Sequence, residues 1–258
     1  MSYFGPALAL WLVKESNMMK VVLILGSAPN VVTARDWPKD NFDKIVAINN
    51  AWKVHDNWDD LIFAYDFEPA RRPIPNVGQN FIDESKFVPL QNSYGGFVYA
   101  GGTMAFTAAY WALGHYQPDV IGFLGCDMVY DQENHTHFYG TGSPDPLRDD
   151  ISLRDLGAKS ARLRIVAAHQ ACAVVNLSPA PSSALLCPRA RHDQLAHEKP
   201  LPFDPNLTQQ AFSQEEYLDY YVPSGRYWLE KDRFEPSAID ALDALWRQAA
   251  YSLPKEGA

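Results

Sequence analysis

The chain has 258 residues, of which 47% are hydrophobic, and its formal net charge at pH 7 is −9. This length suits one large domain, and the apolar content supplies a substantial core and argues against disorder of the whole chain. The acidic balance argues against a nucleic-acid partner, which needs a basic surface, but it is compatible with a local site for a small anion. Three cysteines without CxxC spacing predict neither a disulfide framework nor a zinc site and favour a reducing, cytoplasmic setting.

Two methionines, Met18 and Met19, stand directly before the first strand-like run. The apolar stretch upstream of them is too short to span a bilayer, and no basic residue precedes it as in a signal peptide. We expect residues 1–17 to be a dispensable leader; the alternative is a short helix that packs on the domain or contacts a membrane. Residues 18–188 are expected to form a Rossmann-like nucleotide-binding domain, and residues 189–258 an extension that packs on it.

Five short aliphatic runs predict strands that are buried on both faces of a parallel sheet. They are residues 21–25, 45–48, 61–64, 120–124 and 173–177. Each run ends in small or polar residues, as strands do when their carboxyl ends line a ligand crevice. The strands alternate with helical patterns, which predicts an α/β fold with a Rossmann-like, mostly parallel sheet flanked by helices.

Helical spacing predicts helices over residues 103–113, 153–170 and 236–251. Gly114 is expected to end the first of them as its C-cap. The second carries the cations Arg154, Lys159, Arg162 and Arg164 away from its apolar positions, and we expect several of these charges to be solvated. Residues 66–96 and 131–150 have few regular signals, and long loops of this kind predict a lid-like region.

Small and polar residues follow the first two predicted strands. Gly26 and Ser27 close the first strand, where a small residue lets a ligand approach the backbone and a following helix offers N–H groups to an anion. Asn49 closes the second strand, and its amide offers both a donor and an acceptor to a base or a ribose. The structural alternatives are an ordinary tight turn at Gly26 and a turn-forming asparagine.

Three further positions carry polar groups that suit a ligand. Gly102 and Thr103 precede a predicted helix and form a second cradle for an anion, unless Thr103 is simply its N-cap. Asp127 closes the fourth strand and suits a ribose hydroxyl, a metal or a substrate hydroxyl, or it caps the next turn. Asp66 and Glu68 form a DxE triplet that could hold a metal.

The polar stretch 131–150 contains candidate catalytic residues. His135 and His137 form an HxH pair that lacks a third residue at the usual metal-ligand spacing, and imidazole is a common general base near neutral pH. The alternative is two exposed loop histidines. Arg148 is the best clamp for a phosphate or a carboxylate, because a guanidinium binds either group through two donors.

Taken in order, these motifs resemble glycosyltransferase family 42, the bacterial sialyltransferases that build lipooligosaccharide. The resemblance is carried by residues 23–29, 48–50, 101–103, 112–114, 125–127 with Tyr130, and 175–179 with Ser182 and Ser183. It covers about residues 20–186. A broader group that includes pterin diphosphokinase-like proteins shares the opening motif.

The resemblance implies a GT-A-like variant of the Rossmann fold that binds a cytidine nucleotide sugar without a metal or another cofactor. It places Gly26, Ser27, Asn49, Gly102, Thr103 and Asp127 on the nucleotide side. Tyr130 falls near the tyrosine that holds the donor phosphate. The family's histidine base falls at residues 149–151, where this chain has two aspartates and an isoleucine. We therefore assign the base to His137, the nearest histidine, with Asp149 or Asp150 as the competing candidate.

The sequence therefore predicts a glycosyltransferase that uses a nucleotide-sugar donor, CMP-sialic-acid-like by the resemblance, and a saccharide or glycolipid acceptor in surface-glycan synthesis. Arg148 would contact the donor phosphate. One alternative is a magnesium-dependent pyrophosphoryl transferase of the pterin diphosphokinase type, and another is a binding protein without catalysis. The expected location is the cytoplasm or the inner face of the membrane. A peripheral membrane contact and a homo-oligomer are both compatible with the sequence.

Overall fold

The computed structural model of the chain describes residues 19–130, 136–140 and 148–251. The expected leader, residues 1–17, lies outside these ranges, as do His135 and most of the predicted lid-like stretch 131–150. None of the described helices is long and apolar enough to cross a membrane.

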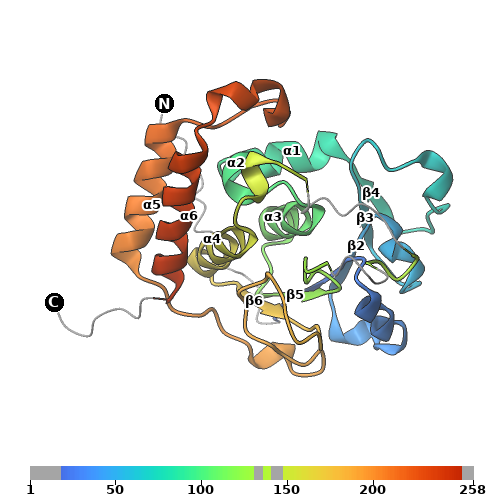
Figure 1. The fold of residues 1–258 in the computed structure, drawn as a ribbon. Helices are drawn as coiled ribbons and strands as arrows, with labels where there is room; N and C mark the ends of the chain where they lie inside the picture. Colours follow the sequence, from blue (N-terminus) through green and yellow to red (C-terminus); the bar gives the residue numbers. More distant parts are fainter. Residues whose placement is uncertain (1–18, 131–135, 141–147, 252–258) are drawn as a thin grey trace.

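Six parallel strands form one sheet in the order β4-β3-β2-β1-β5-β6 (Figure 1). The strands are β1 (Val21–Leu25), β2 (Lys44–Ile48), β3 (Asp60–Ile62), β4 (Asn80–Ile82), β5 (Val120–Leu124) and β6 (Ala173–Asn176). This arrangement confirms the predicted α/β, Rossmann-like class. The strand order reverses between β1 and β5, because the chain runs outward from β1 through β4 and then returns to the other side of β1.

The sheet separates two apolar layers, and alternate residues of a strand contribute to opposite layers. Val22 and Ile24 belong to the cluster on the helical face, whereas Leu23 and Leu25 belong to the cluster on the other face. All four side chains are 0% exposed. Burial on both faces explains why β1 is a continuous aliphatic run rather than an alternating one.

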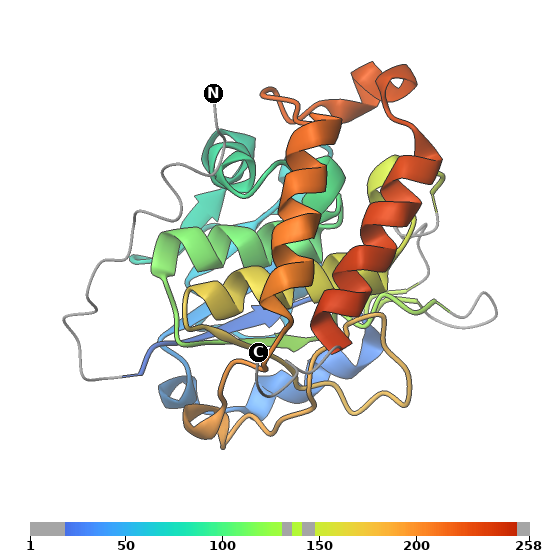
Figure 2. The same cartoon turned by 90° about the vertical axis from the view of Figure 1, so that its left-hand side faces the viewer.

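Within the described ranges, six α-helices lie in two layers on one side of the sheet (Figures 1 and 2). They are α1 (Glu84–Ser93), α2 (Phe97–Ala100), α3 (Met104–Tyr116), α4 (Leu156–His169), α5 (Pro205–Leu218) and α6 (Pro236–Tyr251). Helices α1, α3 and α4 contribute to the core cluster against the sheet. Helices α5 and α6 lie side by side outside α4, and Figure 2 views this outer layer face on. The opposite face of the sheet is covered by short 3-10 helices, the first being Pro29–Asp36.

Several elements differ from the prediction. The stretch 66–96, expected to lack regular structure, contains β4 and α1. Strand β4 has only three residues and lies at the sheet edge, and α1 contains an internal proline, so neither gives a strong periodic signal. Gly114 lies inside α3 rather than at its C-cap, which is Gln117. A Cβ on Gly114 would lie 2.8 Å from Leu90, so this glycine allows α1 to approach α3 closely.

The expectation that several cations of the predicted helix 153–170 are solvated holds for Arg154, which is exposed, but not for the three cations within α4. Lys159 and Arg162 are 0% exposed, and they meet Asp243 of α6 and Glu215 of α5 at 2.8 and 2.7 Å. Arg164 is also buried, and it donates a hydrogen bond to the carbonyl oxygen of Ala250. Buried charges of this kind require partners, so the outer helices provide the counter-charges that allow α4 to pack in the interior.

Candidate functional site

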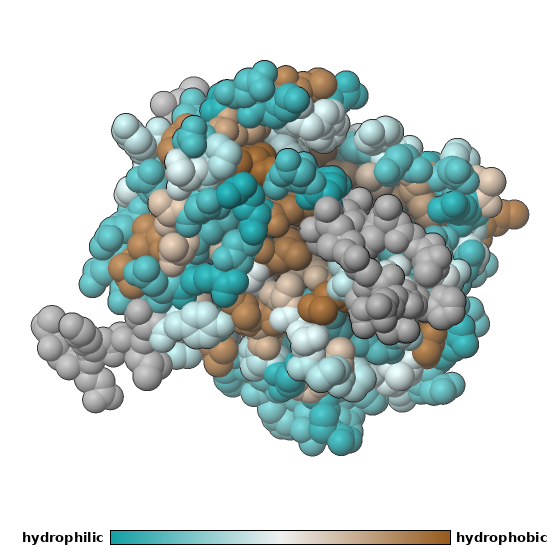
Figure 3. Space-filling view, viewed as in Figure 1, coloured by the Kyte–Doolittle hydropathy of each residue, from teal (hydrophilic) through white to brown (hydrophobic). Residues whose placement is uncertain are grey.

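A cavity of about 1150 Å³ opens at the carboxyl ends of the central strands. It lies where the strand order reverses between β1 and β5, which is where open parallel sheets bind ligands. Figure 3 shows apolar surface in a hollow near the middle of the face seen in Figure 1, with hydrophilic side chains around it. Eight predicted site residues line the cavity: Gly26, Ser27, Asn49, Gly102, Thr103, Tyr130, His137 and Arg148.

The turn after β1 is held against the turn after β5. The Gly26 amide donates to the carbonyl oxygen of Leu124 at 2.8 Å, and the Ala28 amide donates to that of Gly125 at 3.0 Å. A Cβ on Gly26 would lie 2.3 Å from the Gly125 oxygen and 2.6 Å from the Cys126 sulfur. Glycine is therefore required here because two turns of the protein approach each other, which differs from the open space for a ligand that the sequence suggested.

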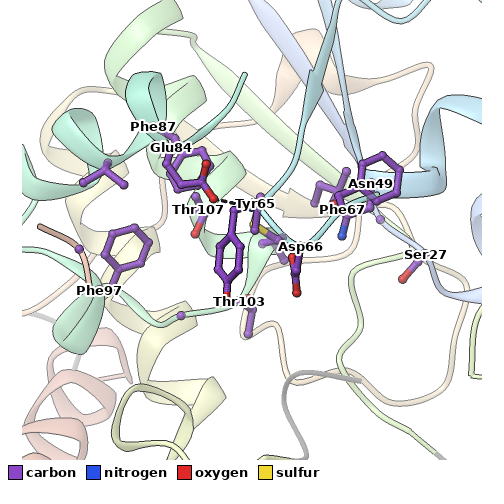
Figure 4. A pocket seen from close by; sticks show the side chains of 18 of the residues that line it. Ser27, Asn49, Tyr65, Asp66, Phe67, Glu84, Phe87, Phe97, Thr103 and Thr107 are labelled. Carbon is purple, nitrogen blue, oxygen red and sulfur yellow. Dashed lines mark hydrogen bonds between the residues drawn. The ribbon is translucent and has the colours of Figure 1, made fainter. Parts of the chain in front are cut away.

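Asn49 follows β2 and faces the cavity with an unusual backbone conformation. Its φ angle is 49°, in the left-handed region that asparagine tolerates better than most residues. Its side-chain oxygen Oδ1 is buried and has no hydrogen-bond partner among the described residues. Figure 4 shows Asn49 and Ser27 at the same end of the cavity. A buried acceptor without a partner favours a ligand that donates a hydrogen bond at this position.

The N-terminus of α3 forms another wall of the cavity. Thr103 is the N-cap of α3, and its hydroxyl accepts from the Phe106 amide at 3.3 Å. The structural alternative for Thr103 is thus correct, while the residue also lines the cavity. Gly102 is enclosed, because a Cβ there would lie 2.4 Å from the Tyr227 hydroxyl and 2.6 Å from the Ser152 hydroxyl. The first-turn amides of a helix of this length favour an anion at the cavity wall.

Arg148 belongs to a hydrogen-bonded network with Asp150 and Tyr227. Arg148 Nε donates to Asp150 Oδ2 at 2.9 Å, and its Nη2 donates to the Tyr227 hydroxyl at 3.1 Å. The Tyr227 hydroxyl donates to Asp150 Oδ2 at 2.8 Å, and Ser152 donates from its hydroxyl to Oδ1 at 2.6 Å. The network fixes one cation, Arg148, at the cavity wall.

The network also sets the protonation of its members. Burial alone would raise the pKa of Asp150, but hydrogen bonds from Ser152, Tyr227 and Arg148 overcome it and hold the pKa below the usual 3.8. Burial and the neighbouring Asp150 carboxylate raise the pKa of Tyr227 to about 12. Near neutral pH, Asp150 is therefore a charged acceptor whose lone pairs are engaged, and Tyr227 is a neutral donor.

His137 reaches the cavity through a short loop that is attached to the first turn. The Phe138 amide donates to the carbonyl oxygen of Ser27 at 2.9 Å, and His137 pairs with Gly140 in a two-residue bridge. The His137 ring lies 5.0 Å from the Tyr139 ring and 6.3 Å from the Tyr130 ring. Burial lowers the pKa of His137 below 6.5, so its imidazole is neutral at pH 7 and able to accept a proton.

Two predicted site residues do not line the cavity. Asp127 is buried, and it accepts hydrogen bonds from Ser178 at 2.5 Å, Asn30 at 3.0 Å and Asn176 at 3.2 Å. These contacts join the ends of β5 and β6 to the turn after β1. Asp149 is exposed and lies outside the cavity lining, whereas its neighbour Asp150 is part of it.

The acidic residues near β3 are not grouped as a metal site. Asp66 lines the cavity, but Glu68 does not, and Glu68 pairs with Arg71 at 3.4 Å on the surface. Within the described ranges, no three His, Cys, Asp or Glu side chains are arranged to hold a metal ion. Besides Asp66 and Asp150, the lining contains the carboxylate of Glu84, which accepts from the Tyr65 amide.

The sequence reasoning missed the contribution of the C-terminal segment to the cavity. Residues 224–229 line it, among them Arg226, Tyr227 and Trp228. The one signal in the sequence was the density of aromatic residues in this tail, which does not indicate where the tail packs.

Comparison with protein-family models, with curated proteins and with solved structures gave no match. The resemblance to glycosyltransferase family 42 therefore stays a prediction.

Proposed function

We propose that this protein is a glycosyltransferase that uses a nucleotide-sugar donor, with a CMP-linked, sialic-acid-like sugar as the first candidate. The observation that carries the proposal is the composition of the cavity at the strand reversal. It combines an unpartnered amide oxygen at Asn49, the N-terminus of α3 and the cation Arg148. This set suits a ligand that has both hydrogen-bond donors and an anionic phosphate.

In the proposed reaction, the neutral imidazole of His137 takes the proton of an acceptor hydroxyl. The hydroxyl oxygen forms a bond to the anomeric carbon, and the bond between that carbon and the donor phosphate breaks. The nucleotide leaves with the electron pair, and Arg148 and the first turn of α3 stabilise the negative charge on its phosphate. The depressed pKa of Asp150 makes its carboxylate a poor proton acceptor, which favours His137 as the base.

A second candidate is a magnesium-dependent pyrophosphoryl transferase. The observation that favours it is the pair of carboxylates, Asp66 and Glu84, in the cavity lining. Carboxylate oxygens are ligands that Mg²⁺ prefers, and phosphates of the substrate would complete its coordination.

Thermal denaturation with CMP, UDP, GDP and ATP, each with and without magnesium, separates these functions. A ligand at a hundredfold excess over its Kd stabilises the native state by about 2.7 kcal/mol. We expect stabilisation by CMP that does not depend on magnesium, followed by release of CMP from CMP-N-acetylneuraminic acid. Stabilisation by ATP only with magnesium would favour the second candidate. Binding of a nucleotide without turnover of any donor would indicate a binding protein, and no binding would overturn the proposal.

A further inference from the structure

The cavity is larger than one small-molecule ligand requires. Its volume of about 1150 Å³ exceeds the range of about 300–1,000 Å³ that is typical of small-molecule sites. Figure 4 shows that the lining extends in one direction from Ser27 and Asn49 to Phe87 and Phe97, with Tyr65 between them. Asn49, whose free oxygen is assigned to the donor, lies at the end with Ser27, so the other end has room for a second substrate.

The second end is built around a row of aromatic rings. The Phe87 and Phe97 rings are 6.4 Å apart edge to face, and Phe97 stacks on Tyr227 at 6.2 Å. The Tyr227 ring meets the Trp228 ring edge to face at 5.6 Å. The row ends at Trp228, which is 48% exposed while it lines the cavity. A large aromatic ring left open to a cavity is typical of a surface on which a ligand stacks.

The position of Trp228 is set by tight contacts of its segment. Gly225 has a φ angle of +73°, and a Cβ there would lie 3.0 Å from Phe97 and 3.1 Å from Val88. Three residues before the tryptophan, the backbone is therefore in close contact with α1 and α2. Directly before the tryptophan, the Tyr227 hydroxyl forms hydrogen bonds with both Asp150 and Arg148. These contacts hold the segment that carries the exposed ring, and Tyr227 connects this segment to the cation that is assigned to the donor phosphate.

Charged side chains accompany the rings at this end. Glu84 and Arg226 both line the cavity, and Arg226 is exposed. A pyranose ring matches such a lining, because its C–H face is apolar and its hydroxyls both donate and accept hydrogen bonds. A purely apolar ligand would displace water from Glu84 and Arg226 without replacing the hydrogen bonds that this water makes.

We propose that this end of the cavity is the acceptor subsite and that it binds a saccharide, whose terminal ring stacks on Trp228 while Glu84 and Arg226 bind its hydroxyls. The proposal rests on the proposed function, since it takes the donor to occupy the other end. The C-terminal extension then determines which acceptor the enzyme uses. The donor and acceptor ends meet at Tyr227, whose hydroxyl bonds to Arg148 and whose ring stacks on Phe97.

The test measures binding of lactose, N-acetyllactosamine, maltose and methyl glucoside to the full chain by ligand-observed NMR, with CMP binding measured by calorimetry in parallel. We expect at least one sugar to bind, and Trp228→Ala to raise its Kd by about tenfold through loss of the stacking contact. Trp228→Phe keeps a ring and should restore most of the affinity. Tyr217→Ala is the matched control, because Tyr217 is 82% exposed and lies outside the cavity lining.

Three results would overturn the acceptor subsite. They are no binding of any sugar in the panel, unchanged sugar affinity in Trp228→Ala, and a loss of CMP rather than sugar affinity in that variant, which would show that the ring stacks on the nucleobase. The proposed function fails separately. If no nucleotide binds but sugar affinity falls in Trp228→Ala, the saccharide subsite stands and the assignment of the other end to a nucleotide is wrong.

Discussion

The Tyr227 hydroxyl donates a hydrogen bond of 2.8 Å to the Asp150 carboxylate, although the two residues are 77 positions apart in the chain. Tyr227 belongs to the C-terminal extension, and Asp150 precedes the helix α4 of the sheet domain. Arg148 donates to both residues. The cation at the cavity wall is thus held from two sides, and its position depends on how the extension packs.

Removal of the Tyr227 hydroxyl should lower the free energy of unfolding and remove one of the contacts that hold Arg148 at the cavity wall. Tyr227→Phe leaves the buried acceptor Asp150 with one donor fewer, and a loss of this kind costs about 1–3 kcal/mol of unfolding free energy. Urea denaturation at neutral pH measures the loss, and Tyr217→Phe on the exposed face of α5 is its control. Equal stability of Tyr227→Phe and the wild type would contradict the role of this hydroxyl in the network.

The same variant should change the dependence of stability on pH. The pKa of Asp150 is depressed below 3.8 in the folded state, so its stabilisation is present above that pH and is lost as the pH falls through the folded pKa. Without the Tyr227 donor the folded pKa rises towards 3.8, and less stabilisation remains to be lost. The difference in unfolding free energy between wild type and variant should therefore be present at neutral pH and shrink in acid. A difference that is independent of pH would show that Tyr227 acts through packing alone.

The buried ion pair between α4 and α5 should be essential for the packing of the C-terminal extension on the sheet domain. Arg162 donates to Glu215 from Nε at 2.7 Å and from Nη2 at 2.8 Å, and both residues are almost fully buried. Glu215→Gln leaves the Arg162 charge without its counter-ion, and breaking a buried pair in this way costs about 3–5 kcal/mol. The measurement is urea denaturation of full-length protein.

Two controls separate burial of charge from the mere presence of an ion pair. The exposed pair Glu230–Arg233 is 2.6 Å apart, yet Glu230→Gln should cost under about 1 kcal/mol because water screens it. The double variant Arg162→Met, Glu215→Leu removes both charges and should recover much of the stability lost in Glu215→Gln. If Glu215→Gln costs no more than Glu230→Gln, the counter-charge explanation for α4 is wrong.

The strands that position the site could be predicted from the sequence, whereas the contacts that complete it could not. Strands β1 and β5 carry no polar side chain along their whole length because both faces are buried, and this pattern can be recognised without a structure. Strand β4 is a three-residue edge strand, Asn80–Ile82, in which only Ile82 is buried, so it gives almost no pattern. The cations of α4 misled the prediction because charge on a helix usually marks solvent. Their partners, Asp243 and Glu215, lie on helices distant in sequence.

The candidate site also contains some residues that could be predicted from the sequence and others that could not. Gly26 and Asn49 directly follow strands, and Thr103 directly precedes a helix. The rules that ligands bind at the carboxyl ends of parallel strands and that anions bind at helix N-termini were therefore sufficient to find them. Tyr227 and Trp228 come from the distant tail, and their place in the lining depends on long-range packing. The sequence also could not reveal the physical role of Gly26, because the close approach of Gly125 arises only when the turns after β1 and β5 pack together.

Asn49 should contribute to nucleotide binding through its unpartnered oxygen. Asn49→Gly is the appropriate variant, because glycine accepts the positive φ of 49° without strain, whereas alanine would add a backbone cost of about 1–2 kcal/mol. Loss of the hydrogen bond to the ligand should weaken CMP binding by about 1–3 kcal/mol, measured by calorimetry. The control is Gln117→Gly, at φ 48° and outside the cavity lining, which should leave CMP binding unchanged. Equal CMP affinity in Asn49→Gly and wild type would place the nucleotide elsewhere.

His137 should act as the general base of the proposed transfer. The neutral imidazole is the active form, so the rate should be maximal above the pKa of His137 and fall as the pH drops through it. Burial lowers this pKa below 6.5, so the ascending limb of the pH–rate profile should have its midpoint below 6.5. If Asp150 were the base, the limb would lie below pH 3.8, because the pKa of that carboxyl is depressed.

His137→Ala should lower turnover of the nucleotide-sugar donor by about 10²–10⁴-fold and remove this limb, while CMP affinity stays close to that of the wild type. His197→Ala is the matched control, since His197 is exposed and outside the cavity lining. Asp149→Asn should retain most of the activity, because Asp149 is exposed and also outside the lining. Full activity in His137→Ala together with a loss in Asp149→Asn would transfer the role of base to the aspartate. That result would also require the loop before α4 to move during turnover, since the structure leaves this side chain outside the cavity.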